Sequence, residues 1–213
     1  MWQRLARVLR QAGHDVLTPS LTGIGERAHL ASPSIDLATH IADALGAIRY
    51  ERLQELVLVG HSYGGMVVTG AADRVAERIT TLVYLDAFVP QSGQALIDLL
   101  RPEVRAHFPA GATQLPPLPP QAQGMTDAAE IAWFDGRRES QPIKTFTQPL
   151  TLEGNYRGTR AYVFCSGYSP TSFAPFAEQA RNNPAWRYHE LPTHHYPQVS
   201  MPRETAGVLL NYA

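Results

Sequence analysis

Apolar and polar positions follow two different periods along this chain. Near the start, apolar side chains recur every three or four residues, which predicts a helix that Gly13 ends. The same spacing predicts helices within residues 35–48, 64–79, 172–183 and 202–212. Between them lie apolar runs of strand length, "DVLTPSL", "ELVLVG", "TLVYLDAFVP", "RAYVFCS" and "WRYHELP". Runs of this kind are typical of strands buried on both faces, so we predict an α/β fold with a mostly parallel sheet flanked by helices.

Residues 91 to about 150 interrupt this alternation. They contain "LPPLPP" and several short amphipathic pieces, but no convincing strand and no second apolar core. We therefore predict a single domain over residues 1–213, with an insertion at about 91–150 that forms a small helical cap above a site. A disordered proline-rich loop is the alternative. A packed cap is favoured by its large apolar residues, Leu96, Leu99, Phe108, Trp133 and Phe134.

Composition and charge exclude several classes of protein. A formal net charge of −1 without a Lys/Arg run argues against a nucleic-acid or membrane partner. No apolar stretch approaches the roughly 20 residues of a membrane span, and the first helix lacks the features of a secretory signal. Cys165 is the single cysteine of the sequence, which excludes an internal disulfide and a multi-thiolate metal site. We expect a cytoplasmic protein, with a homodimer left open.

A serine framed by glycines follows the second apolar run. In "LVLVGHSYGGMVVTG", Gly60, Ser62 and Gly64 match G-x-S-x-G between a predicted strand and a predicted helix. Such a turn forces the serine into strained geometry with its hydroxyl exposed, and we expect both glycines to be required because a side chain would collide with backbone. The Tyr63 backbone N–H would then face a developing oxyanion. A structural turn is the alternative to a nucleophile.

The general base is expected late in the chain. His14 and His40 lie on or beside predicted helices, where surface or packing roles are the simpler interpretation. His194 and His195 follow the last predicted strand, where the base of a serine-first order belongs. No further ligands accompany this pair, so no metal is expected.

The carboxylate that orients the base is the hardest member to place. The loop after "RAYVFCS" contains no Asp, and its only acid, Glu178, lies well inside the next predicted helix. Asp86, in "VYLDAFVP", ends the strand that follows the nucleophile helix, at the sheet edge where α/β ligands bind. We favour Asp86 as the acid over its alternative, a turn-capping residue before Pro90.

Four segments together resemble the α/β-hydrolase fold, and closely the bacterial relatives of the plant methylesterase and hydroxynitrile lyase group. They are "AGHDVLTPSLTGIGERAHL", "LVLVGHSYGGMVVTG", "LVYLDAFVP" and "LPTHHYPQVSMPRE". The resemblance implies Ser62 as nucleophile, the Tyr63 N–H as oxyanion donor and His195 as base, with His194 in place of a family glycine. Many relatives carry the acid after "RAYVFCS", whereas dehalogenase-like members use the strand that ends here in Asp86.

The same resemblance implies an N-terminal shortening. Members open with a strand and a His-Gly loop before the helix that begins here near Trp2. That strand pairs between the counterparts of residues 15–21 and 56–60, and the loop supplies a second oxyanion donor. Losing one such donor typically costs about 10² to 10³ in rate, which leaves open whether the chain as written is active.

These observations predict a serine hydrolase that cleaves a carboxylic ester of a small apolar or aromatic substrate with Ser62, His195 and Asp86. No metal or organic cofactor is expected. His61, Trp133 and Phe134 are predicted to contact the substrate. One alternative is a weak or inactive hydrolase-fold protein that binds a small ligand. Another is a hydroxynitrile lyase-like enzyme, which is disfavoured because the plant lyases have a lysine where this chain has Tyr196.

Overall fold

Four parallel strands form the sheet at the centre of the molecule. The computed structural model describes residues 1–106, 108–109, 111–134 and 136–213. The strands are β1 (Leu56–Ser62), β2 (Ile79–Ala87), β5 (Thr159–Cys165) and β6 (Trp186–Leu191), and they lie in the order β1-β2-β5-β6. Their apolar runs confirm the predicted α/β class, because strands of a parallel sheet covered by helices on both faces bury both sets of side chains.

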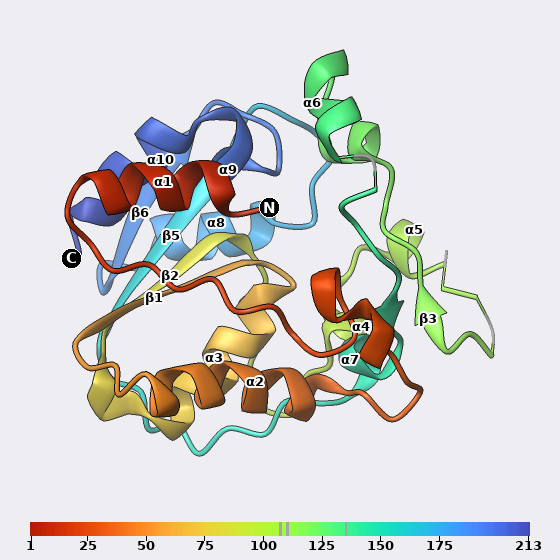
Figure 1. The fold of residues 1–213 in the computed structure, drawn as a ribbon, viewed down its shortest axis with the longest axis horizontal. Helices are drawn as coiled ribbons and strands as arrows, with labels where there is room; N and C mark the ends of the chain where they lie inside the picture. The colour runs from red at the N-terminus through yellow and green to blue at the C-terminus, as the bar shows by residue number, and fades with distance from the viewer. Residues whose placement is uncertain (107, 110, 135) are drawn as a thin grey trace.

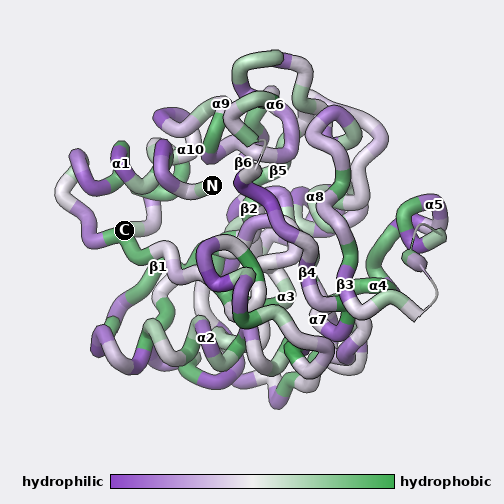
Figure 2. The backbone as a smooth tube through the Cα atoms, turned by 45° about the vertical axis from the view of Figure 1, so that its right-hand side comes forward, coloured by the Kyte–Doolittle hydropathy of each residue, from purple (hydrophilic) through white to green (hydrophobic). Residues whose placement is uncertain are grey.

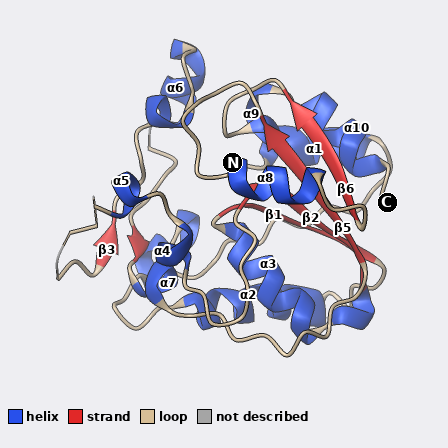
Figure 3. Ribbon diagram, turned by 180° about the vertical axis from the view of Figure 1, so that it is seen from behind, coloured by secondary structure: helices blue, strands red, loops and turns tan. Residues whose placement is uncertain are grey.

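Helices cover the two faces of this sheet (Figures 1 and 3). Helices α1 (Gln3–Gln11) and α10 (Pro202–Leu210) pack on the face that carries Val83 and Leu85. Helices α3 (Gly64–Arg74) and α8 (Ala174–Arg181) cover the face of Leu82 and Tyr84. Alternate residues of β2 therefore point into separate clusters, as the pleat of a strand requires. This packing buries the sheet and leaves the carboxyl ends of its strands to build a site.

Helix α2 (Leu37–Tyr50) packs outside α3 and has a clear N-terminal signal. The Asp36 carboxylate accepts the backbone N–H of Thr39 at 2.9 Å, which satisfies one of the free donors of the first turn. Hydrophilic and hydrophobic positions alternate along this helix (Figure 2), and its apolar side, with Leu37 and Ile41, contacts the core beside Met66. Outside residues 91–150, the other short elements are η1 (Gly25–Leu30), η2 (Ala76–Arg78) and α9 (Pro197–Ser200).

The predicted strand at residues 15–21 is wrong. In the part of the chain that the structure describes, this segment has no strand partner and β1 pairs only with β2. A strand exists only through the ladder it makes with a neighbour, and here the Val16 carbonyl instead accepts a side-chain hydrogen bond from Arg10. As a result β1 is the outer strand of the sheet, and its first four residues are half-exposed.

Residues 91–150 contain short helices and one small sheet. The helices are α4 (Leu96–Leu99), α5 (Pro102–Arg105), η3 (Pro120–Gln123), α6 (Ala128–Phe134) and α7 (Lys144–Thr147). The expectation of no strand here is corrected by β3 (Gln114–Leu115) and β4 (Gln141–Pro142), which form an antiparallel pair. Met125 and Phe134 are buried with Tyr196 in a separate apolar cluster, so α6 packs onto the loop after β6. No helix among the described residues is long and apolar enough to cross a membrane.

Candidate active site

Ser62 lies at the sharp turn between β1 and α3. Its φ of 56° falls in the left-handed region, which a non-glycine residue adopts only when its surroundings hold it there. Tyr63 is the residue that precedes the first turn of α3, and helix α3 begins at Gly64. The backbone N–H of Tyr63 is therefore a free donor at a helix N-terminus, where the helix dipole favours negative charge.

The glycines of the turn have different roles from those predicted. A Cβ on Gly60 would lie 2.5 Å from Val68 Cγ2 and 2.7 Å from the Gly64 oxygen, so Gly60 is required as expected. A Cβ on Gly64 would meet nothing within 4 Å, which corrects the expectation for that position. Gly65 is the second crowded glycine, because its Cβ would overlap with the carbonyl oxygen of Phe88.

Asp86 lies beside Ser62 on the neighbouring strand. In the β1–β2 register Ser62 is opposite Ala87, and the Phe88 N–H donates to the Ser62 carbonyl at 3.2 Å. Asp86 is completely buried and, like Ser62, has a positive φ, of 42°. Two strained residues therefore stand next to each other where adjacent parallel strands end, which is typical of a site whose geometry is fixed by the surrounding fold.

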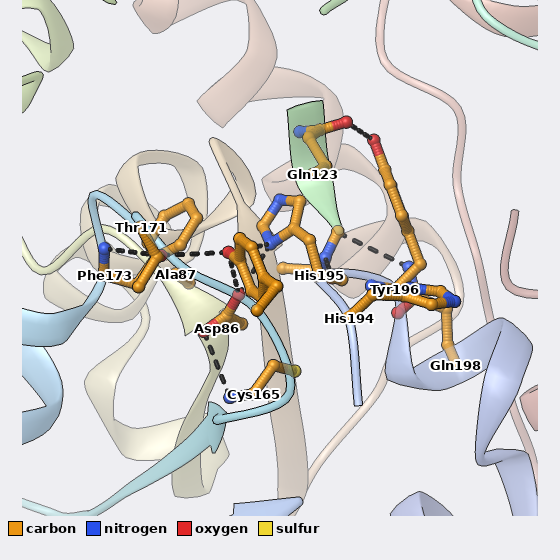
Figure 4. A network of polar contacts seen from close by, with 12 residues as sticks. Asp86, Ala87, Gln123, Cys165, Thr171, Phe173, His194, His195, Tyr196 and Gln198 are labelled. Carbon is orange, nitrogen blue, oxygen red and sulfur yellow. Dashed lines mark hydrogen bonds and ion pairs between the residues drawn. The ribbon is translucent and has the colours of Figure 1, made fainter. Parts of the chain in front are cut away.

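The carboxylate of Asp86 and the imidazole of His195 contact each other directly (Figure 4). Asp86 Oδ2 lies 2.7 Å from His195 Nδ1, and both side chains are buried. The same oxygen accepts the Tyr168 hydroxyl at 2.8 Å, and Oδ1 accepts the Cys165 N–H at 3.2 Å. The predicted acid and the predicted base are thus brought together from positions 109 residues apart.

The ring of His195 is fixed from both sides. It stacks on Phe173 with a centroid distance of 4.7 Å and an interplanar angle of 8°, and the His61 ring lies 4.4 Å away on centroids. The backbone N–H of His195 donates to the Gln123 carbonyl at 3.1 Å. Since Nδ1 keeps its proton and donates it in a hydrogen bond to the Asp86 carboxylate, Nε2 of the neutral ring has the lone pair and can act as a base.

Burial governs the charge states of this pair. It lowers the pKa of His195 and raises the pKa of Asp86, because each charged form loses its hydration. The neighbouring His194 lowers the pKa of His195 further, while the hydrogen bonds from Tyr168 and Cys165 oppose the shift of Asp86. A neutral imidazole at neutral pH is the form that general-base catalysis requires.

His61 is hydrogen-bonded to the main chain of His195. Its Nε2–H donates to the His195 carbonyl at 2.6 Å, since a carbonyl can only accept, and its Nδ1 lies 3.5 Å from Gln198 Nε2. Burial lowers the pKa of His61 to about 3, so this ring is also neutral. The polar atoms of His61 are therefore used within the protein, and its contact with substrate stays a prediction.

The two cap aromatics lie in different surroundings. Phe134 is buried and packs on Tyr196, the residue directly after the predicted base, with 4.5 Å between ring centroids. Trp133 is half-buried, and the guanidinium groups of Arg4 and Arg137 lie 5.1 Å and 4.7 Å from its centroid. Phe134 thus borders residues 192–196, the loop after β6 that carries His195 and is called the base loop below. Trp133 instead contacts two cations, and for both aromatic side chains the substrate contact stays a prediction.

His40 contributes more than the packing role that the sequence suggested. The ring is completely buried, and its Nε2–H donates to the Thr22 carbonyl at 2.8 Å. Nδ1 therefore accepts the Tyr63 hydroxyl at 2.9 Å, which ties the residue after Ser62 to helix α2. The helical pattern around His40 gave no signal of this contact, because it depends on how α2 packs against α3.

His194 joins the base loop to the cap. Its Nε2 lies 2.9 Å from Glu130 Oε2, and the other Glu130 oxygen lies 3.5 Å from Arg4. Glu130 belongs to α6 and Arg4 to α1, so one carboxylate connects three separate segments. Within the described ranges, no three His, Cys, Asp or Glu side chains are grouped so that they could hold a metal ion.

Comparisons with known proteins show the family and the fold of this chain. Residues 1–208 match the model of a family described as the alpha/beta hydrolase family. The carbendazim hydrolyzing esterase of Nocardioides sp. (strain SG-4G) is 42% identical over 219 residues, covering 96% of this chain and 90% of that protein. The alpha-hydroxynitrile lyase of Arabidopsis thaliana is 33% identical over 95 residues, covering 43% of this chain and 36% of that protein.

Solved structures share the fold. An extracellular alpha/beta-hydrolase from a Paenibacillus species has a TM-score of 0.86 at 21% identity, covering 100% of this chain and 93% of that one. A methylesterase from Arabidopsis has a TM-score of 0.79 at 19% identity, covering 99% of this chain and 91% of that one.

Proposed function

Because this chain belongs to the alpha/beta hydrolase family, we propose that it hydrolyses carboxylic esters with Ser62 as nucleophile, His195 as general base and Asp86 as the acid that orients the base. The predicted fold class and enzyme class, a hydrolase of the esterase kind, are confirmed by the family match and by the 42% identical esterase. The identity of the three residues and of the substrate is the proposal. The cytoplasmic location, the homodimer and the absence of nucleic-acid and membrane partners remain predictions from the sequence.

One observation carries the proposal. The buried Asp86 carboxylate lies 2.7 Å from His195 Nδ1, on the strand next to the one that ends in the strained Ser62. A purely structural turn at residues 60–65 has no need of a buried Asp–His pair beside it, and burying such a pair costs free energy. A carboxylate, an imidazole and a half-buried serine hydroxyl at one sheet edge are the parts of a serine hydrolase.

The reaction follows from these roles. Ser62 Oγ attacks the ester carbonyl carbon while His195 Nε2 takes its proton, and Asp86 stabilises the imidazolium that forms. The carbonyl oxygen becomes an oxyanion that the Tyr63 N–H at the start of α3 stabilises. Collapse breaks the bond to the alcohol, which leaves with the proton from Nε2. In the second half, His195 Nε2 takes a proton from water as the water oxygen attacks the acyl carbon. The bond to Ser62 Oγ then breaks, Oγ regains the proton from Nε2, and the acid is released.

The proposed substrate is a methyl ester or methyl carbamate of an aromatic compound. The relative that covers most of this chain is named for the hydrolysis of carbendazim, a benzimidazole methyl carbamate. Aromatic side chains gather around the base, since Phe173 stacks on His195 and Phe134 packs on Tyr196. Flat rings of a substrate gain contact area from such surroundings.

Two alternatives make different demands on the site. A hydroxynitrile lyase of the plant type uses a cation after the catalytic histidine, whereas the hydroxyl of Tyr196 is directed to the Gln123 amide oxygen. A binding protein without catalysis would retain the fold but not a reactive Ser62. Tyr196 in place of that cation disfavours the lyase, and the buried Asp86–His195 contact disfavours the binding protein.

The test combines labelling with turnover. A fluorophosphonate probe should modify the protein at Ser62 with one label per chain, and p-nitrophenyl acetate and carbendazim should both be hydrolysed. Ser62→Ala should abolish labelling and lower kcat by about 10⁴ or more, while the matched control Ser34→Ala, in an exposed loop, should change neither. Asp86→Asn should retain the fold and lose roughly 10³ to 10⁴ in kcat. A labelled and active Ser62→Ala variant would exclude Ser62 as nucleophile, and an unlabelled wild type would favour the binding protein.

A further inference from the structure

The loop that follows β5 brings a tyrosine to the Asp86 carboxylate. This loop contains no Asp, and its third residue after the strand is Tyr168. The Tyr168 hydroxyl lies 2.8 Å from Asp86 Oδ2 and 3.3 Å from His195 Nδ1. It therefore touches both partners of the buried pair, at the oxygen that they share.

The hydrogen-bond directions around Tyr168 follow from its neighbours. The Phe173 N–H must donate, and it donates to Thr171 Oγ1 at 3.1 Å. The Thr171 hydroxyl in turn donates to the Tyr168 oxygen at 3.0 Å. Because His195 Nδ1 carries its own proton toward Asp86, the remaining acceptor for the Tyr168 proton is the carboxylate. Hydrogen bonds therefore run from the Phe173 N–H through the Thr171 and Tyr168 hydroxyls to Asp86 Oδ2. Their direction favours the ionised form of Asp86, which can only accept.

The backbone around Tyr168 leaves it little freedom. The Gly167 N–H donates to the Thr193 carbonyl at 2.9 Å, and a Cβ on Gly167 would lie 2.7 Å from the backbone of Thr193. Gly124 also lies close to this residue, because a Cβ on Gly124 would lie 2.8 Å from Tyr168 Cγ. Close packing around Tyr168 therefore limits how far its hydroxyl can move from the carboxylate.

We propose that Tyr168 is a positioning residue of the hydrolytic reaction, whose phenol keeps the Asp86 carboxylate ionised and aimed at His195 Nδ1. This inference rests on the proposed function of Ser62, His195 and Asp86. Tyr168 acts through Asp86, and the proton that it donates is not transferred in the reaction. A charged carboxylate without bulk water needs hydrogen-bond donors, and a hydrogen bond to the charged form favours that form.

The titratable groups that face Asp86 come from several segments. Tyr162 and Cys165 face it from β5, Tyr168 from the following loop, His195 from the base loop and His61 from β1. Burial raises the pKa of Asp86, and the Tyr168 hydrogen bond is the largest opposing influence. Removing that hydrogen bond should let the Asp86–His195 pair take up a proton at higher pH.

The principal experiment is the pH dependence of Tyr168→Phe, which removes only the hydroxyl. We expect kcat to fall by about tenfold with KM changed less than twofold, and the acidic limb of kcat/KM to move up by roughly one pH unit. Tyr188→Phe is the matched control, because the Tyr188 hydroxyl also donates to a carboxylate, that of Glu190 at 2.9 Å, but on the surface. A purely structural role would lower stability without moving the limb. An unmoved limb in folded Tyr168→Phe overturns the proposal.

A second variant and a second readout complete the test. Thr171→Val removes the donor to the Tyr168 oxygen and should move the acidic limb of kcat/KM in the same direction by a smaller amount. If Tyr168→Phe does not fold, an unmoved limb in Thr171→Val overturns the proposal. The Asp86 carboxyl can also be titrated by ¹³C NMR, assigned with Asp86→Asn, and its pKa should rise in Tyr168→Phe. This readout needs no substrate, so a protein without esterase activity would refute the proposed function while still testing Tyr168.

Discussion

Ser62 and Phe88 are joined by a backbone hydrogen bond that locks two turns together. The Phe88 N–H donates to the Ser62 carbonyl at 3.2 Å, so the turn after β1 and the bend after β2 cannot move independently. The two turns are also in close contact at a second point, because Gly65 lies against the carbonyl of Phe88. The strained conformations of Ser62 and Asp86 are held by this junction.

Alanine substitutions at the two adjacent glycines should therefore differ sharply. Gly65→Ala forces a methyl group into the Phe88 carbonyl and should destabilise the protein by about 3 kcal/mol or more. Gly64→Ala meets open space at the start of α3 and should change stability by less than about 1 kcal/mol. Urea unfolding of both variants measures the difference. Equal stabilities would contradict the crowding at Gly65.

The His40–Tyr63 contact should matter for both stability and rate. Tyr63→Phe leaves the buried Nδ1 of His40 without a donor, at a cost of about 1–3 kcal/mol in the free energy of unfolding. Since Tyr63 also carries the oxyanion N–H, we expect kcat to fall several-fold while the fluorophosphonate still labels Ser62. Chemical unfolding and ester turnover are the two measurements, with the surface variant Tyr50→Phe as control. Wild-type values for both would show that the contact is dispensable.

Acid should destabilise the protein through its buried neutral histidines. The folded pKa of His61 is lowered to about 3 by burial, and burial also lowers those of His40 and His195. Below about pH 6.5 the unfolded state then binds more protons than the folded state. The stability that the neutral histidines contribute is therefore complete above this pH and is lost as the pH falls toward 3. Each such histidine contributes a slope of up to ~1.4 kcal/mol per pH unit. The raised pKa of Asp86 has the opposite sign and offsets only one of them.

The measurement for this prediction is the free energy of unfolding between pH 7.5 and 5. His61→Gln keeps an amide donor for the His195 carbonyl and should flatten the dependence, whereas His14→Gln, on a half-exposed histidine, should leave the slope as it is. A wild-type protein equally stable at both values would rule out neutral burial of these rings.

The Glu130 connection between cap and base loop should affect substrate binding more than chemistry. Glu130→Gln removes the charge that faces His194 and Arg4, without loss of volume. We expect KM to rise two- to fivefold with kcat nearly constant, because α6 would be held less firmly above the base loop. Glu139→Gln, an exposed acid of the same region, is the control. A large fall in kcat at constant KM would instead assign Glu130 to the chemical step.

Much of the fold and part of the site followed from local patterns. The runs around Leu82 and Val163 predicted buried parallel strands because apolar continuity reports burial on both faces, and the turn at Ser62 was evident from its glycines. Asp86 was predicted because it ends a strand, and the structure places it against His195. These features are encoded within a few neighbouring residues.

The errors have a common cause in long-range contacts. Residues 15–21 have the composition of a strand, but no described segment pairs with them, and pairing is not a property of the segment itself. Gly65 rather than Gly64 is the crowded glycine because the obstacle, Phe88, comes from another strand. Tyr168 went unnoticed since a tyrosine after a strand carries no chemical signature until the fold brings it to Asp86.

The hydrogen bond from the His195 N–H to the Gln123 carbonyl has a consequence for how a substrate enters. The backbone of His195, the proposed base, is hydrogen-bonded to the last residue of η3. Gly124, which follows η3, lies close to Tyr168. A cap that swung away as one body would pull the imidazole out of line with each turnover. We therefore expect residues 123–124 to stay in place during turnover, so that the His195 imidazole keeps its position beside Asp86.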